Sequence, residues 1–423
     1  MIHQITKLGE ACYPSPLSRF VSDDLFVPEV VIRGPSAPSQ EWGFELAGPR
    51  AKLFFDPAHT RAGIVTCGGL CPGMNNVIRS LFNELQHAYG VKEVLGFRGG
   101  FQGLDPERGQ EPIVLTPEFV DDIHRRGGTV LGTSRGKVNE EAAIKNLARV
   151  GVDILFTIGG DGTQRGGNEL FQMARQQGHA LAVVGIPKTV DNDVAFVART
   201  FGYLTAVQEA GTVLDRAHAE ARSVQNGIAL VKVMGRHAGF IAVGATVASQ
   251  EVNFCLIPEV PFKLDRFLEA LKERLQRRAH ALIVVAEGVG QEWLVNTDAD
   301  RDASGNVKLG DIGAFLRGQI EAYFKAEKIP IVMRYFDPSY HVRSGAANSE
   351  DSILCDLFAR HAVHAAMAGK TGLVIGFLHD EFIHVPIELL ASRRKSIDAG
   401  GPVWSGTLAA SGQPALFREP AVP

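Results

Sequence analysis

The chain has 423 residues, of which 45% are hydrophobic and 21% are charged, and its formal net charge is -4. This composition is typical of a globular protein with more than one domain, and it excludes general disorder. We expect neither nucleic acid nor a membrane as a partner, because the chain is mildly acidic and no run approaches the roughly 20 apolar residues that span a bilayer. Its 5 cysteines suggest no disulfide framework, which favours a cytoplasmic location.

Residues 1–60 carry repeated prolines, so we expect an N-terminal extension with a few strands that packs on the body of the protein. From Ala62 onward, short Val- and Ile-rich runs alternate with amphipathic stretches, which predicts βαβ units and parallel sheets. Strands are expected at 62–66, 154–158, 182–186, 227–233, 281–286 and 372–377. Helices are expected at 75–88, 166–177, 203–223, 266–278 and 349–368. The tail after Gly400, rich in small residues, is expected to be loosely held.

Polar loops follow three of these strands, and ligands of open α/β sheets bind at the carboxyl ends of strands. The first loop, TCGGLCPGMNN at 66–76, has glycines that let the backbone approach a ligand, and it leads into a helix whose free N–H groups attract phosphate. Its spacing matches neither the Walker loop nor the dinucleotide fingerprint. Taken alone, it could equally be a tight turn that binds nothing.

The second loop is GGDGT at 159–163. A carboxylate flanked by glycines, Asp161, suits a Mg²⁺ ion that bridges phosphate oxygens, and the glycines leave room for a polyphosphate. The alternative is that Asp161 only caps the next helix.

The third loop, GIPKTVDND at 185–193, places two carboxylates, an amide, a hydroxyl and a lysine within six residues. Phosphoryl transfer to a hydroxyl needs a carboxylate that accepts the proton and positive groups that stabilise the phosphoryl. Asp191 is the candidate base, Lys188 or Arg236 the candidate stabiliser, and Asp193 a second carboxylate on the metal side. An Asx-turn could be as polar, but three such loops at strand ends favour phosphoryl-transfer chemistry.

From about residue 62 to about residue 398 the chain resembles the phosphofructokinase family. Seven strings carry the resemblance in the family's order: GGLCPGMN at 68–75, GGTVLGTSR at 127–135, GGDG at 159–162, PKTVDND at 187–193, MGR at 234–236, AEG at 286–288 and DPSYHVR at 337–343. The resemblance implies a glycolytic enzyme that transfers the γ-phosphoryl group of ATP, with Mg²⁺, to the 1-hydroxyl of fructose 6-phosphate. The implied fold is α/β, with two Rossmann-like three-layer domains, largely parallel sheets and the N-terminal extension.

The same resemblance implies how the chain divides and assembles. After the extension at 1–60, a phosphoryl-donor domain would comprise 61–202 with 342–392, and a fructose 6-phosphate domain would comprise 203–341 with the tail 393–423. Arg334 matches an arginine that many relatives supply from a neighbouring subunit, so we expect a homo-oligomer, either a dimer or a tetramer.

Residue by residue, the resemblance makes Asp191 the base that deprotonates the 1-hydroxyl, with Thr189 and Asp193 beside it, and it places Asp161 at the Mg²⁺–phosphate site. It lines the donor site with Gly68, Gly69, Arg135, Gly162, Thr163 and Gly166. It assigns the fructose phosphate to Met234, Gly235, Arg236, Glu287, Arg334, Tyr340 and Arg343.

Two positions bear on the identity of the donor. Lys188 is typical of pyrophosphate-using relatives, but those usually carry a second aspartate after Asp161, where this chain has Gly162. A second carboxylate would crowd and repel the nucleotide α-phosphate, so the glycine favours ATP. Gly162 with Lys188 and a long extension resembles the ATP-dependent enzymes of plants and trypanosomatid parasites.

Two alternatives stay open: pyrophosphate as the donor, and a non-catalytic subunit that senses sugar phosphates. The intact set of Asp161, Asp191, Asp193 and Arg236 argues against the second, because a subunit freed from catalysis has no chemical need to keep all four.

Overall fold

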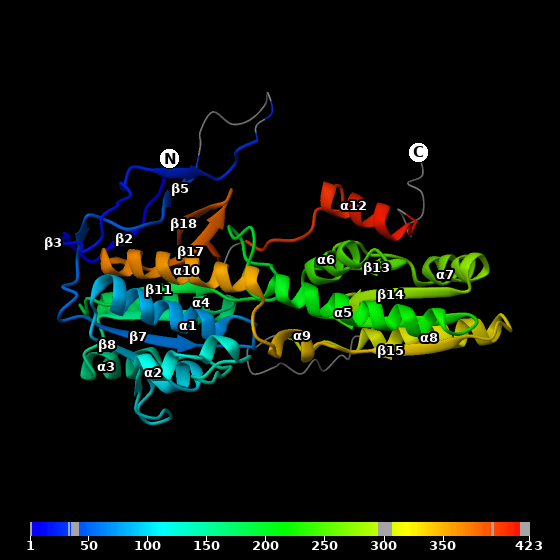
Figure 1. The fold of residues 1–423 in the computed structure, drawn as a ribbon, viewed down its shortest axis with the longest axis horizontal. Coiled ribbons are helices and arrows are strands. Elements are labelled where there is room, and N and C mark those ends of the chain that lie inside the picture. Colours follow the sequence, from blue (N-terminus) through cyan, green and yellow to red (C-terminus); the bar gives the residue numbers. More distant parts are fainter. Residues whose placement is uncertain (1, 33, 35–41, 295–306, 391–392, 415–423) are drawn as a thin grey trace.

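The computed structural model describes residues 2–32, 34, 42–294, 307–390 and 393–414. Two sheets with helices on their faces lie side by side along the long axis of the molecule (Figure 1). The larger sheet carries the N-terminal strands at one edge, and the smaller sheet is formed by strands between residues 227 and 336. No helix in the described part of the chain is long and apolar enough to cross a membrane.

Among the described residues the larger sheet has ten strands. Its central strands β8, β7, β10, β11 and β17 run parallel. Their Val- and Ile-rich runs are buried, as expected for a parallel sheet that is covered on both faces. In spatial order the strands are β1 (Ile2–His3), β5 (Gly43–Leu46), β18 (Glu381–Pro386), β17 (Leu373–Leu378), β11 (Ala182–Pro187), β10 (Ile154–Gly159), β7 (Arg61–Thr66), β8 (Glu93–Phe97) and β9 (Ile113–Val114), with β4 (Phe26–Pro28) paired to β5.

The smaller sheet is parallel throughout its described strands and has the order β13 (Phe254–Leu256), β14 (His280–Ala286), β12 (Gly227–Val233) and β15 (Val332–Phe336). Two short antiparallel pairs complete the described strands: β2 (Thr6–Lys7) with β16 (Lys370–Thr371), and β3 (Tyr13–Pro14) with β6 (Lys52–Leu53).

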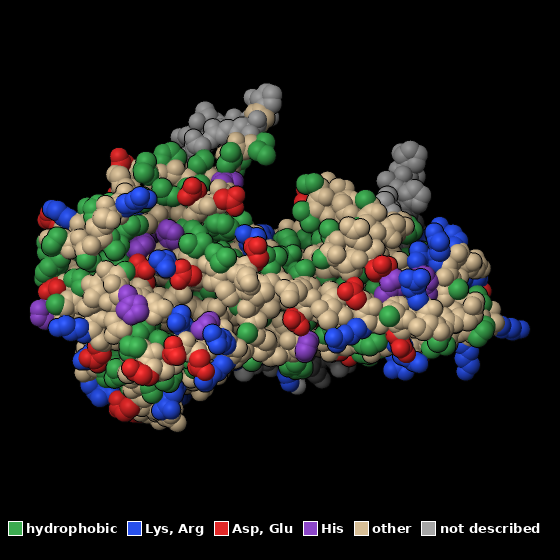
Figure 2. All heavy atoms as spheres, in the orientation of Figure 1, with side chains coloured by type: hydrophobic (Ala, Val, Ile, Leu, Met, Phe, Trp, Pro, Cys, Tyr) green, Lys and Arg blue, Asp and Glu red, His purple; other side chains and the backbone are tan. Residues whose placement is uncertain are grey.

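The α-helices are α1 (Met74–Asn83), α2 (Pro117–Val120), α3 (Glu140–Arg149), α4 (Asp161–Gln176), α5 (Tyr203–Arg222), α6 (Phe240–Ser249), α7 (Leu264–Arg278), α8 (Ile312–Ala326), α9 (His341–Ser344), α10 (Ser349–Met367), α11 (Ile387–Leu390) and α12 (Pro402–Ser411). Acidic and basic side chains alternate over the face in Figure 2, and basic side chains gather at the end of the smaller-sheet half, where α7 finishes with Arg277 and Arg278.

The α/β fold class predicted from the sequence is confirmed. Each expected strand and helix is present; the strand at 227–233 has the expected bounds, and the others have shifted ends. Three expectations need correction. The GGDGT string is not a loop between a strand and a later helix, because Gly159 ends β10, Gly160 is the N-cap residue and α4 starts at Asp161. The helix expected over 75–88 continues beyond α1 as a π-helical segment, Glu84–Tyr89. The described part of the tail, up to residue 414, is not loose, because its helix α12 buries Trp404; residues 415–423 lie outside the described residues.

An ion network attaches the N-terminal extension to the larger sheet. The Glu45 carboxylate on β5 accepts hydrogen bonds from Arg50, at 2.6 Å, and from the almost fully buried Lys370 on β16. Asp23, which also belongs to the extension, accepts from Lys370 at 2.7 Å and from Lys7 at 2.6 Å. Buried charges need such partners, because a lone ion in the interior costs several kcal/mol.

We predict that Lys370→Met lowers the free energy of unfolding by about 3 kcal/mol, because it leaves buried carboxylate charge with one cation fewer. The matched control is Lys7→Met, which removes an exposed partner of Asp23 and should cost less than about 1 kcal/mol. Chemical denaturation of both variants tests this prediction, and equal losses would contradict it.

Candidate active site

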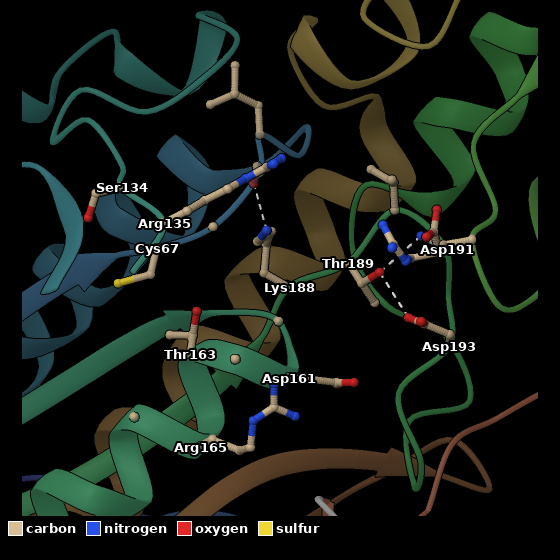
Figure 3. A pocket seen from close by; sticks show the side chains of 18 of the residues that line it. Cys67, Ser134, Arg135, Asp161, Thr163, Arg165, Lys188, Thr189, Asp191 and Asp193 are labelled. Atoms are coloured by element: carbon tan, nitrogen blue, oxygen red, sulfur yellow. Dashed lines mark hydrogen bonds between the residues drawn. The ribbon is translucent and has the colours of Figure 1, made fainter. Parts of the chain in front are cut away.

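A pocket of about 670 Å³ opens where loops from the two sheets converge (Figure 3). On the larger sheet it lies beyond the carboxyl ends of β7, β10 and β11, and on the smaller sheet beyond those of β12 and β14. The pocket is lined by most of the residues that the sequence predicted: Gly68, Gly69, Arg135, Asp161, Gly162, Thr163, Gly166, Lys188, Thr189, Asp191, Asp193, Met234, Arg236, Glu287 and Arg343.

Three predicted residues do not line this pocket. Gly235 lies in the turn between two lining residues and has φ of 130°, where a Cβ atom would approach the Ala238 carbonyl oxygen to 2.7 Å. Arg334 lies on the exposed part of β15 and pairs with Glu220 at 3.2 Å. Tyr340 is 74% exposed, and the Arg343 guanidinium lies 4.5 Å from the centre of its ring.

Lys188 joins the first and third loops. Its ammonium donates to the Gly69 carbonyl oxygen at 2.6 Å, and a Cβ atom on Gly68 would lie only 3.4 Å from the same Nζ. The side chain is buried, and burial lowers its pKa from the usual lysine value. The first loop therefore lies directly against the Lys188 ammonium, and a side chain in place of Gly68 would fill the space beside it.

The first turn of α4 forms the floor of the pocket on the side of the larger sheet. Gly160 is the N-cap residue, and Asp161, Gly162 and Thr163 follow at the positive end of the helix dipole, which attracts anions. Burial and then the charge of Asp193 raise the pKa of Asp161. A carboxylate at this end of a helix, close to another carboxylate, suits a cation shared with a bound phosphate.

The loop after β11 presents its two carboxylates differently. Thr189 donates its hydroxyl to Asp193 at 3.0 Å and accepts the Asp191 backbone N–H at 3.1 Å, so this side chain fixes the loop between them. Asp191 Oδ1 is buried and has no hydrogen-bond partner among the described residues. Burial, followed by the charges of Asp193 and Glu287, raises the pKa of Asp191 to about 8. A raised pKa makes this carboxylate, once ionised, a stronger base towards a ligand hydroxyl.

Charged side chains from the smaller-sheet half face Asp191 across the pocket. Glu287 follows β14, and burial raises its pKa although Arg236, Lys232 and Arg343 oppose that shift. Arg236 follows β12 and donates to the Val307 carbonyl oxygen. Two arginines and one carboxylate on this side can bind a phosphate and a neighbouring hydroxyl.

Several polar residues of the pocket were not predicted from the sequence: Ser134, Lys137, Arg165, Glu169, His237 and Arg394. Ser134 lies inside a recognised string, and Lys137, Arg165 and His237 lie within three residues of one, so proximity to a motif could have indicated them. Arg394 had no such signal. It reaches the pocket from the C-terminal part of the chain, and its Nε lies 3.5 Å from Asp161 Oδ2.

A divalent cation fits this site only together with a ligand. Among the described residues no cluster of three or more His, Cys, Asp or Glu side chains could hold a metal by itself. Asp161 and Asp193 both line the pocket and repel each other, as the raised pKa of Asp161 indicates. Mg²⁺ is typically bound by one or two carboxylates together with substrate phosphates, which is the donor set that these residues offer.

A glycine-rich loop, a helix N-terminus and a carboxylate with one buried, unpartnered oxygen meet between the two sheets, and together they define an enzyme of the phosphotransferase class. The family model described as "Phosphofructokinase" matches residues 61–366, and the chain belongs to this family.

Relatives extend the likeness beyond that core. The chain is 45% identical to an ATP-dependent 6-phosphofructokinase from Borreliella burgdorferi, over 88% of this chain and 86% of that protein. It is 41% identical to an ATP-dependent 6-phosphofructokinase from Trypanosoma brucei brucei, over 95% of this chain and 85% of that protein. The predicted resemblance to the long trypanosomatid enzymes is thereby confirmed.

Among solved structures, the fold is similar to a pyrophosphate-dependent phosphofructokinase from Marinobacter aquaeolei, with a TM-score of 0.70 and 20% identity. That likeness covers 83% of this chain and 91% of the other. At this identity it supports the fold alone.

The pKa of Asp191 predicts how stability depends on pH. The folded protein holds a proton on this carboxyl up to about pH 8, whereas an ordinary aspartate releases it near 3.8. Between these values the carboxyl is ionised in the unfolded chain and still protonated in the folded one. The free energy of unfolding therefore falls as pH rises through this range. Asp191→Asn removes this effect. The melting temperature of the variant relative to the wild type should rise from pH 5 to pH 8 and then level off. A difference that stays constant with pH would contradict the assignment.

Proposed function

We propose that this chain is an ATP-dependent 6-phosphofructokinase, which transfers the γ-phosphoryl group of ATP to the 1-hydroxyl of fructose 6-phosphate in glycolysis. The observation that carries the proposal is the buried, unpartnered Asp191 oxygen between a glycine-rich anion site and a cationic half-pocket. The names of the relatives at 41–45% identity support the same donor and acceptor.

In this proposal the two sides of the pocket hold different substrates. ATP lies along the first loop and the first turn of α4, where Gly68, Gly69 and Gly162 leave its phosphates room and Arg135 supplies charge. Fructose 6-phosphate lies on the smaller-sheet side, where Arg343 and Arg236 face its phosphate and Glu287 accepts a sugar hydroxyl. The 1-hydroxyl then points towards Asp191.

Asp191 acts on the acceptor as the general base. The sugar oxygen attacks the γ-phosphorus in line as its proton passes to the carboxylate, and the bond from this phosphorus to the bridging oxygen breaks, so that ADP leaves. Lys188 and Arg236 offset the negative charge that develops on the transferring group, and Thr189 keeps the loop fixed through its two hydrogen bonds. Asp161 and Asp193 would hold Mg²⁺, which neutralises phosphate charge when bound.

The division into domains, the oligomer and the location belong to the same proposal. The proposed donor domain comprises 61–202 with 342–392, and strands β7 to β11 and β17, which share the larger sheet, support it. The proposed sugar domain comprises 203–341 with 393–423, and the smaller sheet supports it. Arg334 is exposed and does not line the pocket of its own chain. This position supports a homo-oligomer, either a dimer or a tetramer, in which each site is completed between subunits. We propose a cytoplasmic location.

Gly162 provides a test of the donor. It has ordinary backbone angles, and a Cβ atom there would meet only Arg165 at 3.8 Å, so the fold tolerates a side chain. We expect turnover of fructose 6-phosphate with ATP and not with pyrophosphate. Gly162→Asp should lower kcat/KM for ATP by at least about 100-fold, because its charge repels the α-phosphate.

The isosteric control is Gly162→Asn, which adds the same volume without the charge and should retain much more activity. Turnover of the wild type with pyrophosphate alone would replace the proposed donor. No turnover with either donor, despite binding of fructose 6-phosphate, would indicate a non-catalytic subunit.

Asp191→Asn tests the base. The amide keeps the shape of the side chain but accepts no proton, so kcat should fall by about 10²–10⁴-fold with KM values little changed. Initial rates with ATP and fructose 6-phosphate measure this effect. A loss below tenfold would assign the proton to another group.

A further inference from the structure

Residues 393–398, here called the crossing segment, connect the two halves of the pocket. They follow α11, which packs on the larger sheet, and precede α12, which packs on α6 of the smaller-sheet half (Figure 1). The segment lies beyond residues 61–366, the part that the family model matches. Its contacts nevertheless converge on the loop that carries Asp191.

Lys395 makes the most extensive of these contacts. Its ammonium donates to three oxygens of the loop after β11: Asn192 Oδ1 at 2.9 Å, the Val197 carbonyl at 2.7 Å and the Ala198 carbonyl at 2.9 Å. These bonds use all three ammonium protons. Asn192 itself has the unusual φ of 55°, and its Oδ1 also accepts the Thr200 N–H at 3.0 Å.

The backbone of the crossing segment reinforces the same loop. The Lys395 N–H donates to the Asp193 carbonyl oxygen at 3.0 Å, and Arg394 forms an antiparallel bridge with Val194. The residues immediately after Asp191 are therefore held by the side chain and by the backbone of residues about two hundred positions away in the sequence. Lys395 does not itself line the pocket, so its side chain acts on the pocket through the loop that it holds.

The far end of the segment is fixed to the other half of the pocket. Lys395 Nζ lies 5.0 Å from the ring centre of Phe240, the first residue of α6. The Ile397 N–H donates to Glu259 Oε1 at 3.0 Å, and the Glu259 carboxylate also accepts the N–H of Gly239, the N-cap residue of α6. Beyond the segment, α12 ends at Ser411, and the side chain of Gln413, two residues later, accepts the Cys255 N–H at 2.6 Å.

We propose that Lys395 is a positioning residue: it holds the loop after β11 so that Asp191 faces the acceptor, and the crossing segment couples this loop to the sugar side of the pocket. The inference rests on the proposed function, because it assumes that Asp191 acts on a bound sugar hydroxyl. Lys395 bonds to residues on the C-terminal side of Asp191 and does not line the pocket, which distinguishes this role from direct catalysis.

The test is Lys395→Met, which keeps the length of the side chain and removes the three hydrogen bonds. Misplacement of the base affects the chemical step more than binding, so kcat with ATP and fructose 6-phosphate should fall by about 10–100-fold while both KM values change by less than about threefold. Hydrogen exchange of the amides in 189–200 should become faster in the unliganded variant. The control is Lys272→Met. Lys272 lies on α7 and does not line the pocket, and its replacement removes an ion pair with Glu327 at the surface, so both readouts should stay unchanged.

The exchange measurement needs no turnover, so the two proposals can fail separately. A wild type without activity towards fructose 6-phosphate defeats the proposed function, while faster exchange in 189–200 of the variant still shows that Lys395 orders the loop. Unchanged kcat in Lys395→Met overturns the positioning role, whatever happens to the melting temperature. A lower kcat without faster exchange in 189–200 overturns it as well, because the effect would then reach the site by another route.

Discussion

The site depends on the burial of one carboxylate. Asp191 lines the pocket with one oxygen buried and without a hydrogen-bond partner among the described residues, and its ionisation is opposed by desolvation and by the neighbouring charges of Asp193 and Glu287. A protein tolerates such a group only when the surrounding structure holds it in place, because the loop would otherwise turn the carboxylate to water. The contacts of Thr189, Asn192 and Lys395 supply that restraint.

The rest of the pocket follows from this constraint and from the geometry of parallel sheets. Strands β7, β10 and β11 end at one edge, so the glycine loop, the first turn of α4 and the Asp191 loop are neighbours although they are far apart in the chain. Lys188 links two of these loops by donating to Gly69. The smaller sheet directs the ends of β12 and β14 to the same space and adds Arg236 and Glu287, so anionic ligands meet cations from both halves.

Long-range contacts come from segments outside the recognised motifs. The crossing segment bonds the Asp191 loop at Lys395 and the start of α6 through Glu259. Within the larger-sheet half, Lys370 donates to Glu45 and Asp23 and holds the N-terminal extension in place. Lys395 and Asn192 are 203 positions apart, and Lys370 and Glu45 are 325 positions apart, so only the folded chain brings these groups together.

The sequence by itself determined the α/β class, the main strands and helices, and most of the residues that line the pocket, because hydrophobic periodicity and glycine-rich strings are local properties of a chain. It could not determine that a helix begins at Asp161 within the GGDGT string, because the backbone hydrogen bonds of the folded chain decide where a helix begins. Nor could it reveal that the tail forms the packed helix α12, that Arg394 reaches Asp161, or that Lys395 holds the loop of the base. Those features depend on which distant segments meet when two sheets pack, and only the tertiary structure decided them.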